Sequence, residues 1–453
     1  MSAILEHHRQ DWGNMPVLSP QPHATVQVGD LTLDYRMHFL VPQSLTVLAA
    51  HAKRQGLSEQ IAALCSGQVQ ALHAVYRKPL DEQPVDLQTE AQLVTDFVAA
   101  FHQGKILGST GEPLTMVVNL GIGGSDLGMR MATQALMAYP QRTPVHFYAT
   151  LGEHTWAQLI QQCDPKRTLF IIASKSFQTP ETLSNAARAK AWLQAHGCDF
   201  KAHCVAVTAV PERAIAYGLP AAHVFRMSLD IGGRFSIWSA MGLSVRLALG
   251  NAVYQELLMG AHCMDLHVQN APFLENMPVM LALIAYWYIQ FWEKNAQAIL
   301  PYDARLGEWA RYVQQLEMES NGKHLDKLGH PVKGLTAPIV FGEYGVLGQH
   351  TFFQWLHQAP SWVPIDLMMV MADLEASAHC RSQMAALAQN NRPFSLLQMP
   401  DITPHTLGML MSLYEHKVFS LATLWNINPF DQPGVELGKK FYQEHAELSL
   451  TMS

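Results

Sequence analysis

The chain has 453 residues, of which 49% are hydrophobic and 15% are charged, and its formal net charge is −7. This length predicts two or three domains around a large apolar core, and the negative charge gives no reason to expect nucleic acid or an acidic membrane as a partner. The six cysteines form no C-x-x-C pair, which is typical of a protein kept in a reducing cytoplasm.

The longest apolar run covers residues 279–292 and contains one glutamine. A membrane-spanning helix needs roughly 20 apolar residues, so we expect this run to form a helix buried inside the protein. The first residues of the chain contain no apolar signal core. We therefore predict a cytoplasmic protein without a membrane partner.

The first 115 residues give few signals. Residues 1–55 contain scattered prolines and indicate no clear element. Two helical patterns follow, one that begins at Ser58 and continues to residue 75, and one that ends at Gly104.

The next stretch alternates between strand and helix patterns. This alternation predicts a parallel sheet with helices on both faces, and ligands of such sheets bind beyond the carboxyl ends of the strands. After residue 250 helical patterns dominate, which indicates a second α/β unit. Strands are expected at residues 116–120, 145–149, 168–173, 203–208 and 224–227 in the first unit, and at 337–341 and 365–370 in the second.

Residues 117–128 join a buried-strand pattern, a turn with three glycines and the start of an amphipathic helix. Such a turn can present free backbone N–H groups to an anion. A dinucleotide fingerprint would need glycine in place of Asp126, a P-loop would need Lys-Ser/Thr in place of Leu127 and Gly128, and a nucleophile elbow would need glycine at 127. Two interpretations stay open: a phosphate site for a ligand other than a nucleotide, and an ordinary strand-to-helix turn.

A second turn of this kind, S-K-S-F-Q-T at residues 174–179, follows the strand expected at residues 168–173. Pro180 suits the first position of a helix and Thr179 the N-cap. Hydroxyls and N–H groups donate to phosphate oxygens, and Lys175 adds positive charge. An ordinary helix cap with a solvated lysine is the alternative, but two such turns on neighbouring strands favour phosphate.

Three further residues have side chains suited to proton transfer or charge stabilisation. Arg234 follows two glycines and could stabilise an oxyanion, or form a surface ion pair. Glu319 shares a helix face with Gln315 and could be a general base, or simply lie at a helix end. His350 could be an acid–base residue, although with 22 histidines in the chain it could also be a bystander.

Taken together, these segments resemble the glucose-6-phosphate isomerases, also called phosphoglucose isomerases, of the sugar-isomerase superfamily. The resemblance runs in order through G-I-G-G-S, S-K-S-F-x-T-x-E-T, G-G-R-F-S, M-E-S-N-G-K, G-Q-H-x-F and F-D-Q-x-G-V-E-L-G-K. It implies two α/β sandwich domains, each with a mainly parallel sheet flanked by helices. The smaller domain is expected at residues 80–250, the larger at 1–79 plus 251–430, and a C-terminal segment at 431–453.

The resemblance also implies the reaction, an aldose–ketose isomerisation of glucose 6-phosphate and fructose 6-phosphate without metal or cofactor. Glu319 would carry a proton between C2 and C1 through a cis-enediolate, and Arg234 would stabilise its negative charge. His350 and Lys439 would open the sugar ring, with the histidine supplied by the other subunit of a homodimer. The residues expected to hold or position the sugar phosphate are Gly124, Ser125, Ser174, Lys175, Ser176, Thr179, Gly233, Gln315 and Gln432.

Two other functions stay open at this stage. A regulatory relative could bind a sugar phosphate without turning it over, although such proteins tend to lose the base and the ring-opening pair. The same chemistry could also act on another sugar phosphate, for example mannose 6-phosphate.

Overall fold

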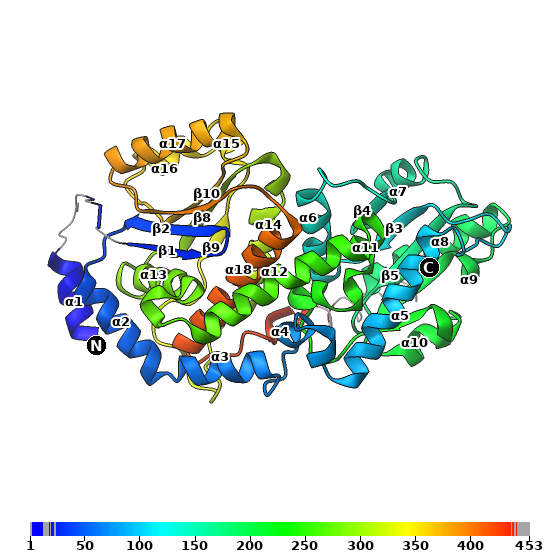
Figure 1. The fold of residues 1–453 in the computed structure, drawn as a ribbon, viewed down its shortest axis with the longest axis horizontal. Coiled ribbons are helices and arrows are strands. Elements are labelled where there is room, and N and C mark those ends of the chain that lie inside the picture. The colour runs from blue at the N-terminus through cyan, green and yellow to red at the C-terminus, as the bar shows by residue number, and fades with distance from the viewer. Residues whose placement is uncertain are drawn as a thin grey trace.

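The protein is described here by a computed structural model, which covers residues 2–11, 18, 20–21, 24–435, 437–438 and 441. It has two lobes, each with a β-sheet covered by helices, and the long helices α12 (Asn251–Asn270) and α18 (Pro404–Leu424) pack against each other in the middle (Figure 1). The predicted α/β class, with two sheets flanked by helices, is therefore confirmed.

The sheet of the smaller lobe has five parallel strands in the order β4-β3-β5-β6-β7. Every strand predicted for this region is present, and each predicted end lies within one residue of the observed one. Hydrophobic runs without alternation made these strands recognisable, because a parallel strand is buried on both faces. The strands are β3 (Met116–Leu120), β4 (Val145–Tyr148), β5 (Thr168–Ala173), β6 (Cys204–Thr208) and β7 (Val224–Arg226).

Successive side chains of these strands point to opposite faces of the sheet. Val117 and Ile171 belong to the large central core, whereas Val118 and Ile172 belong to a separate outer core. Different helices complete the two faces. The central face is covered by α5 (Val85–His102), α6 (Leu127–Ala135) and α11 (Leu243–Leu249), and the outer face by α7 (Glu153–Ile160), α8 (Pro180–Ala195), α9 (Phe200–His203) and α10 (Pro211–Ala216).

The sheet of the larger lobe has six strands in the order β1-β2-β11-β10-β8-β9. The four strands from β11 to β9 are parallel to one another, whereas β2 pairs antiparallel with both β1 and β11. Two of these strands were predicted, at residues 337–341 and 365–370, and the first of them begins two residues later than predicted. The bounds are β1 (Thr25–Val28), β2 (Leu31–Met37), β8 (Ala296–Tyr302), β9 (Ile339–Phe341), β10 (Ile365–Val370) and β11 (Phe394–Met399).

The expectation that residues 1–55 contain no clear element is wrong. Strand β2 alternates buried and partly exposed residues, with Leu31, Leu33 and Tyr35 pointing inward. Only every second residue of β2 faces the core, so the hydrophobic signal of this strand is weaker than that of a central strand. The long helix expected from Ser58 to residue 75 is also wrong, because Gly67 takes a φ of +81° and ends α3 there.

Helices cover both faces of the larger sheet. Helix α13 contains the apolar run up to Phe291, and all residues of this helix except Gln290 are buried, as predicted. No helix in the described part of the chain is long and apolar enough to span a membrane. The remaining helices are α1 (Ser2–Asp11), α2 (Pro42–Arg54), α3 (Leu57–Ser66), α4 (His73–Tyr76), α13 (Met277–Phe291), α14 (Trp309–Asn321), α15 (Gly345–Gly348), α16 (Phe353–Gln358) and α17 (Leu374–Gln389).

One apolar core runs from the inner face of one sheet to the inner face of the other. It contains Val117 and Ile171 of the smaller sheet together with Ile299 and Met368 of the larger one. The domain borders at residues 80–250 and 1–79 plus 251–430 therefore stay a prediction, because helices between the sheets contribute to both sides.

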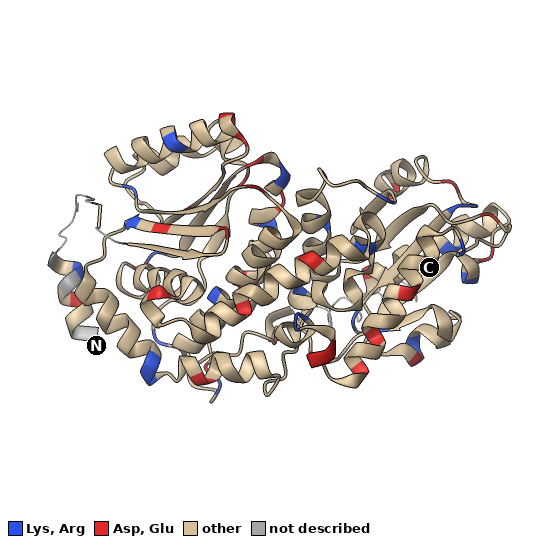
Figure 2. Ribbon diagram, in the orientation of Figure 1, with Lys and Arg blue, Asp and Glu red and all other residues tan. Residues whose placement is uncertain are grey.

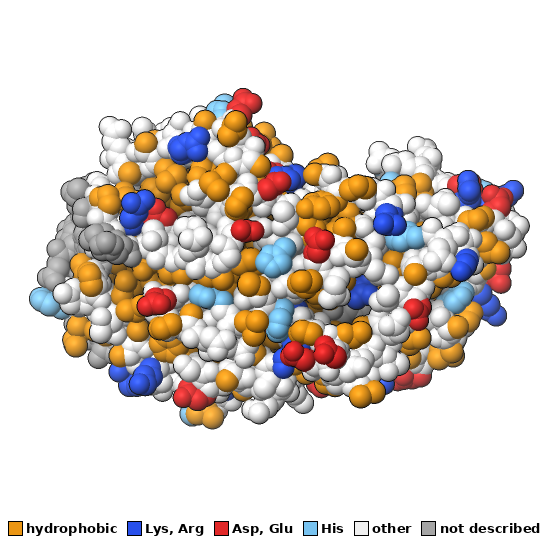
Figure 3. Space-filling model, in the orientation of Figure 1, with side chains coloured by type: hydrophobic (Ala, Val, Ile, Leu, Met, Phe, Trp, Pro, Cys, Tyr) orange, Lys and Arg blue, Asp and Glu red, His pale blue; other side chains and the backbone are white. Residues whose placement is uncertain are grey.

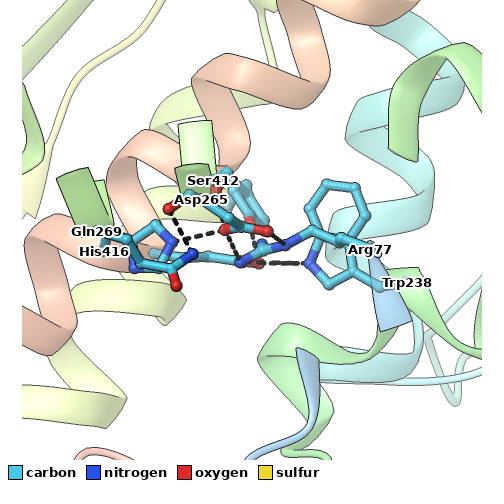
Figure 4. A network of polar contacts seen from close by, with 8 residues as sticks. Arg77, Trp238, Asp265, Gln269, Ser412 and His416 are labelled. Carbon is cyan, nitrogen blue, oxygen red and sulfur yellow. Dashed lines mark hydrogen bonds and ion pairs between the residues drawn. The ribbon is translucent and has the colours of Figure 1, made fainter. Parts of the chain in front are cut away.

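A buried network of charges joins the elements between the sheets (Figure 4). The guanidinium of Arg77 donates to both carboxylate oxygens of Asp265, at 2.6 and 2.9 Å, and also pairs with Glu415. Glu415 accepts in turn from the indole nitrogen of Trp238 at 2.9 Å, and His416 lies 2.6 Å from Asp265. This network thereby ties α4, α12 and α18 to the segment that follows Gly233.

Charged residues of both signs are interspersed along the ribbon and gather in no continuous field of one sign (Figure 2). On the face shown in Figure 3, apolar side chains are scattered among polar ones. The view agrees with the low charged fraction and the modest net charge of the chain.

Candidate active site

The order of strands in the smaller sheet defines where a ligand pocket can form. Strand β3 continues through α6 to β4 on one side of it, whereas β5 continues through α8 to β6 on the other side. The connections after β3 and β5 therefore leave in opposite directions and open a crevice at the carboxyl ends of these two strands. Both turns predicted from the sequence to bind phosphate lie at this crevice, because Leu120 and Ile172 are register partners.

The turn after β3 comes into direct contact with the segment that carries Arg234. A Cβ atom on Gly124 would lie 2.2 Å from the carbonyl carbon of Gly233 and 2.5 Å from the nitrogen of Arg234. Only glycine permits this approach, and Gly123 has a φ of +56°, which also favours glycine. Ser125 is buried, and its carbonyl accepts from the side chain of Asn119 at 3.0 Å.

The turn after β5 has an unusual backbone. Phe177 has a φ of +50°, which is uncommon for a residue with a side chain. The hydroxyls of Ser174 and Thr179 lie 3.1 Å apart, and Thr179 occupies the N-cap of α8 as predicted but makes no capping bond to the helix. The first N–H groups of α8 thus have no side-chain cap, which leaves them available to an anion.

The two remaining residues of this turn differ in exposure. Ser176 is exposed, and its carbonyl accepts from Arg213 at 2.7 Å. Lys175 is half-buried, and burial lowers the pKa of its ammonium from the ordinary value, with a further lowering by Arg234 against the pull of Asp230. Lys175 lines the same cavity as Gly232 and Asp431, so the second turn and the segment that carries Arg234 belong to the same region.

Arg234 is the residue that connects the other predicted groups. It lies in the 3-10 helix η4 (Gly233–Trp238) and is only 5% exposed. Its Nε donates to the hydroxyl of Ser320 at 2.7 Å and one terminal nitrogen to the side-chain oxygen of Gln432 at 3.2 Å. The other terminal nitrogen donates to the carbonyls of Pro429 and Asp431. The interpretation of Arg234 as a surface ion pair is therefore wrong.

Helix α14 brings Gln315 and Glu319 to the same region. The side-chain nitrogen of Gln315 lies 3.1 Å from the position that a Cβ atom on Gly123 would occupy, so this side chain contacts the first turn. A carboxylate oxygen of Glu319 lies 3.5 Å from Arg234, and the side chain of Glu319 is 26% exposed. The spacing of four residues thus places both side chains on one helix face, as predicted.

The charge of Arg234 is only partly compensated. Burial lowers the pKa of its guanidinium from the ordinary value, while Glu319 and Asp431 act in the opposite direction. An arginine nevertheless stays protonated in proteins. A buried cation whose closest partners are neutral oxygens can stabilise a negative charge that develops next to it.

A cavity of about 420 Å³ opens beside this cluster. Its lining includes Lys175, Gly232 and the backbone segment of Pro429 and Asp431 that accepts from Arg234. The volume is sufficient for a small molecule.

His350 is not joined to this cluster. It is exposed in the turn after α15, and among the described residues no hydrogen bond or ion pair connects it to Glu319 or Arg234. Within one chain, the structure therefore assembles the predicted base and arginine but leaves the predicted ring-opening histidine aside. Lys439, its predicted partner, lies outside the described residues.

Sequence reasoning missed two residues that contact the cluster directly. Ser320 accepts from Arg234, and Lys323 donates to the carbonyl of Asp431 at 2.9 Å. A signal for Lys323 was available, since a lysine just after a helix end often donates to the last carbonyls. No group of three His, Cys, Asp or Glu in the described part of the chain is arranged to hold a metal ion.

Comparisons with known proteins agree on one family. The family model of phosphoglucose isomerase matches residues 71–391 and 382–451. A glucose-6-phosphate isomerase of Pseudomonas putida is 37% identical over 90% of this chain and 84% of its own length. One of Chromohalobacter salexigens is 38% identical over 93% of this chain and 85% of its own.

Two solved structures share the fold over nearly the whole chain. The glucose-6-phosphate isomerase of Chlamydia trachomatis is 25% identical in sequence and matches with a TM-score of 0.88. The match covers 99% of this chain and 95% of that one. A hypothetical protein of Thermus thermophilus is also 25% identical, with a TM-score of 0.76 over 92% and 99% of the two chains. The chain therefore belongs to the phosphoglucose isomerase family.

Proposed function

We propose that this protein catalyses the reversible isomerisation of glucose 6-phosphate and fructose 6-phosphate. The observation that carries the proposal is the contact between Arg234, a nearly buried cation, and Glu319, at the crevice where two phosphate-type turns meet. Family membership supports the same reaction.

The chemistry requires a base and a cation next to each other. A C–H group beside a carbonyl is a weak acid, so its removal needs a carboxylate at the carbon and positive charge at the oxygen. Glu319 is the base that carries the proton between C2 and C1, and Arg234 stabilises the enediolate. Their separation of 3.5 Å means that an oxygen bound near Arg234 brings its neighbouring carbon within reach of Glu319.

The other end of the substrate is a phosphate dianion, which we assign to the two turns. Backbone N–H groups without side-chain caps and a half-buried lysine suit this dianion. We assign the positioning of the sugar to Gln315, Gln432 and Gly233, because Gln315 and Gly233 contact the first turn and Gln432 accepts from Arg234. The residues assigned to the phosphate are Gly124, Ser125, Ser174, Lys175, Ser176 and Thr179.

A coupled assay with purified protein tests the function. Both sugar phosphates should be converted, and in D₂O deuterium should enter the product at C1 or C2, because a carboxylate exchanges its proton with solvent during transfer. Binding of a sugar phosphate without turnover would contradict the proposal and support a regulatory protein. Conversion without any deuterium would contradict Glu319 as the base.

We further propose that ring opening uses His350 of the neighbouring subunit, together with Lys439, in a cytoplasmic homodimer. The support is that His350 is exposed and apart from the Glu319 cluster in its own chain. Mixing inactive Glu319→Gln chains with inactive His350→Ala chains tests this proposal. A shared site should restore about a quarter of the activity after subunit exchange, since half of the dimers are mixed and each has one intact site. No recovery in confirmed mixed dimers would contradict it.

A further inference from the structure

Lys323 lies two residues beyond the end of α14 and is held at unusually many points. Its ammonium donates to the carbonyl oxygens of Glu319 at 3.0 Å, Ser320 at 2.8 Å and Asp431 at 2.9 Å. A lysine has three N–H donors, so these three carbonyls use them all. Its side chain is only 10% exposed, and the carboxylate of Asp431 lies 3.4 Å away. Lys323 is therefore an anchored lysine rather than a solvated one.

Two of these acceptors belong to the last turn of α14. The carbonyls at the end of a helix have no partner within it, and Lys323 supplies one to Glu319 and to Ser320. A cation at this position also interacts favourably with the negative end of the helix. Lys323 thus stabilises the turn that carries the proposed base.

The third acceptor lies in the segment that also accepts from Arg234. Arg234 reaches the hydroxyl of Ser320 and the carbonyl of Asp431, whereas Lys323 reaches the carbonyls of the same two residues. Two cations therefore join the end of α14 to the segment that continues to Gln432. If Lys323 is lost, Arg234 alone must hold these two segments together.

The charge of Lys323 also affects its neighbours. Burial lowers the pKa of its ammonium from the ordinary value and Arg234 lowers it further, while Asp431 and Glu319 raise it. A neutral side chain at position 323 removes this positive charge from beside the carboxylate of Asp431 and from the end of α14.

We propose that Lys323 is a positioning residue of the isomerase reaction, which holds the Glu319 turn and the Gln432 segment in the arrangement that Arg234 requires. The inference rests on the proposed function. Lys323 acts through other residues, because its donors are all used by the protein.

The test compares Lys323→Met, Lys323→Arg and, as a matched control, Lys333→Met. Lys333 lies in the same loop between α14 and β9 and is exposed. Its side chain makes no hydrogen bond or ion pair with any of the described residues. In Lys323→Met we expect kcat to fall roughly 10- to 100-fold through misplacement of the base. KM should change less than about threefold, the pattern of an interaction felt in the transition state.

The control and the conservative variant separate position from charge. Lys333→Met should behave as the unmodified protein, and Lys323→Arg should restore part of kcat. A kcat of Lys323→Met within twofold of the unmodified protein overturns the inference. A loss of kcat that equals the loss of folded protein also overturns it.

Two further outcomes are also decisive. If Lys323→Met does not fold, Lys323→Gln, which keeps two donors without the charge, is judged by the same criteria. If the unmodified protein converts neither sugar phosphate, the proposed function fails, and the inference fails with it. An active unmodified protein with an unaffected Lys323→Met overturns the inference alone.

Discussion

Two buried arginines, Arg77 and Arg234, have different roles in this protein because they have different partners. Arg77 is surrounded by the carboxylates of Asp265 and Glu415, which raise the pKa of its guanidinium despite the opposing effect of burial. Arg234 has one carboxylate at 3.5 Å and otherwise neutral oxygens, and burial lowers the pKa of its guanidinium. Both arginine side chains are buried to a similar extent, so the opposite shifts of their pKa values come from their different partners.

The difference shows which cation remains available for chemistry. The charge of Arg77 is neutralised inside the protein, so the residue can stabilise the packing of α12 against α18 but cannot attract a substrate (Figure 4). The charge of Arg234 is left largely uncompensated next to a cavity. Buried ion pairs often contribute little net stability, but breaking one by removing a partner is costly. The two sites should therefore respond to mutation in opposite ways.

The largest effect is expected for Glu319→Gln at the Arg234 site. The amide cannot accept a proton, so kcat should fall by about 10²- to 10⁴-fold, while thermal stability should change little because the shape is kept. Turnover in the coupled assay and a thermal melt of the same sample measure the two quantities. Near-normal turnover in a folded variant would refute the assignment of the base.

The next effect is expected for Arg77→Met in the buried network. This change leaves Asp265 and Glu415 without their shared cation, so the free energy of unfolding should drop by roughly 3–5 kcal/mol. Burial already raises the pKa of Glu415 to about 7, so the loss should be smaller at pH 6 than at pH 8. Urea titrations at both pH values measure it. Equal stability to the unmodified protein would contradict a structural role.

A matched pair of conservative changes sharpens the contrast. Arg234→Lys should lower kcat by about 10²- to 10³-fold, because a lysine cannot reproduce the donors directed at the developing charge. Arg77→Lys should instead lower stability while kcat per folded molecule stays close to normal. Kinetics and melts on both variants test the pair. The contrast would not hold if both variants lost activity and stability in the same proportion.

The smallest effect concerns Glu90, a half-buried carboxylate that accepts hydrogen bonds from neutral donors. It accepts from the hydroxyl of Tyr76 at 3.0 Å and from the backbone of Ala240 at 3.4 Å, and burial raises its pKa from 4.5 to about 7. Because the folded state binds this proton more tightly, its stabilising contribution is complete below about pH 4.5 and is lost as the pH rises through about 7.

Glu90→Gln tests this dependence by difference. The amide does not titrate, so the stability of the variant relative to the unmodified protein should increase between pH 5 and pH 8, on the order of 1–3 kcal/mol. Thermal melts of both proteins across this range provide the measurement. A difference that does not change with pH would show that Glu90 does not titrate as expected.

The smaller sheet was predictable from the sequence, and part of the larger one was not. Strands β3 and β5 are mostly apolar, with one polar residue each, Asn119 and Thr168, so they could be recognised without reference to a neighbouring strand. Strand β2 is half polar and pairs antiparallel with β1 and with β11, which lies more than 350 residues later in the chain. The pairing with β11 leaves no local signal.

The candidate site divides in the same way. The glycines at 123–124 and 232–233 and the spacing of Gln315 and Glu319 were visible as local patterns. Ser320 and Lys323 were not recognised as partners, because their contacts depend on Asp431 and Arg234, which are distant in the sequence.

The order of residues along the chain thus determined the α/β class, the strands of the smaller sheet and the groups able to grip a phosphate or move a proton. Only the tertiary structure decided which charges are neutralised and which stay available, since that depends on whether a carboxylate or a carbonyl from a remote segment comes to rest beside each cation. Local propensity acts over a few residues, whereas the field at Arg77 or Arg234 is the sum over everything packed around it.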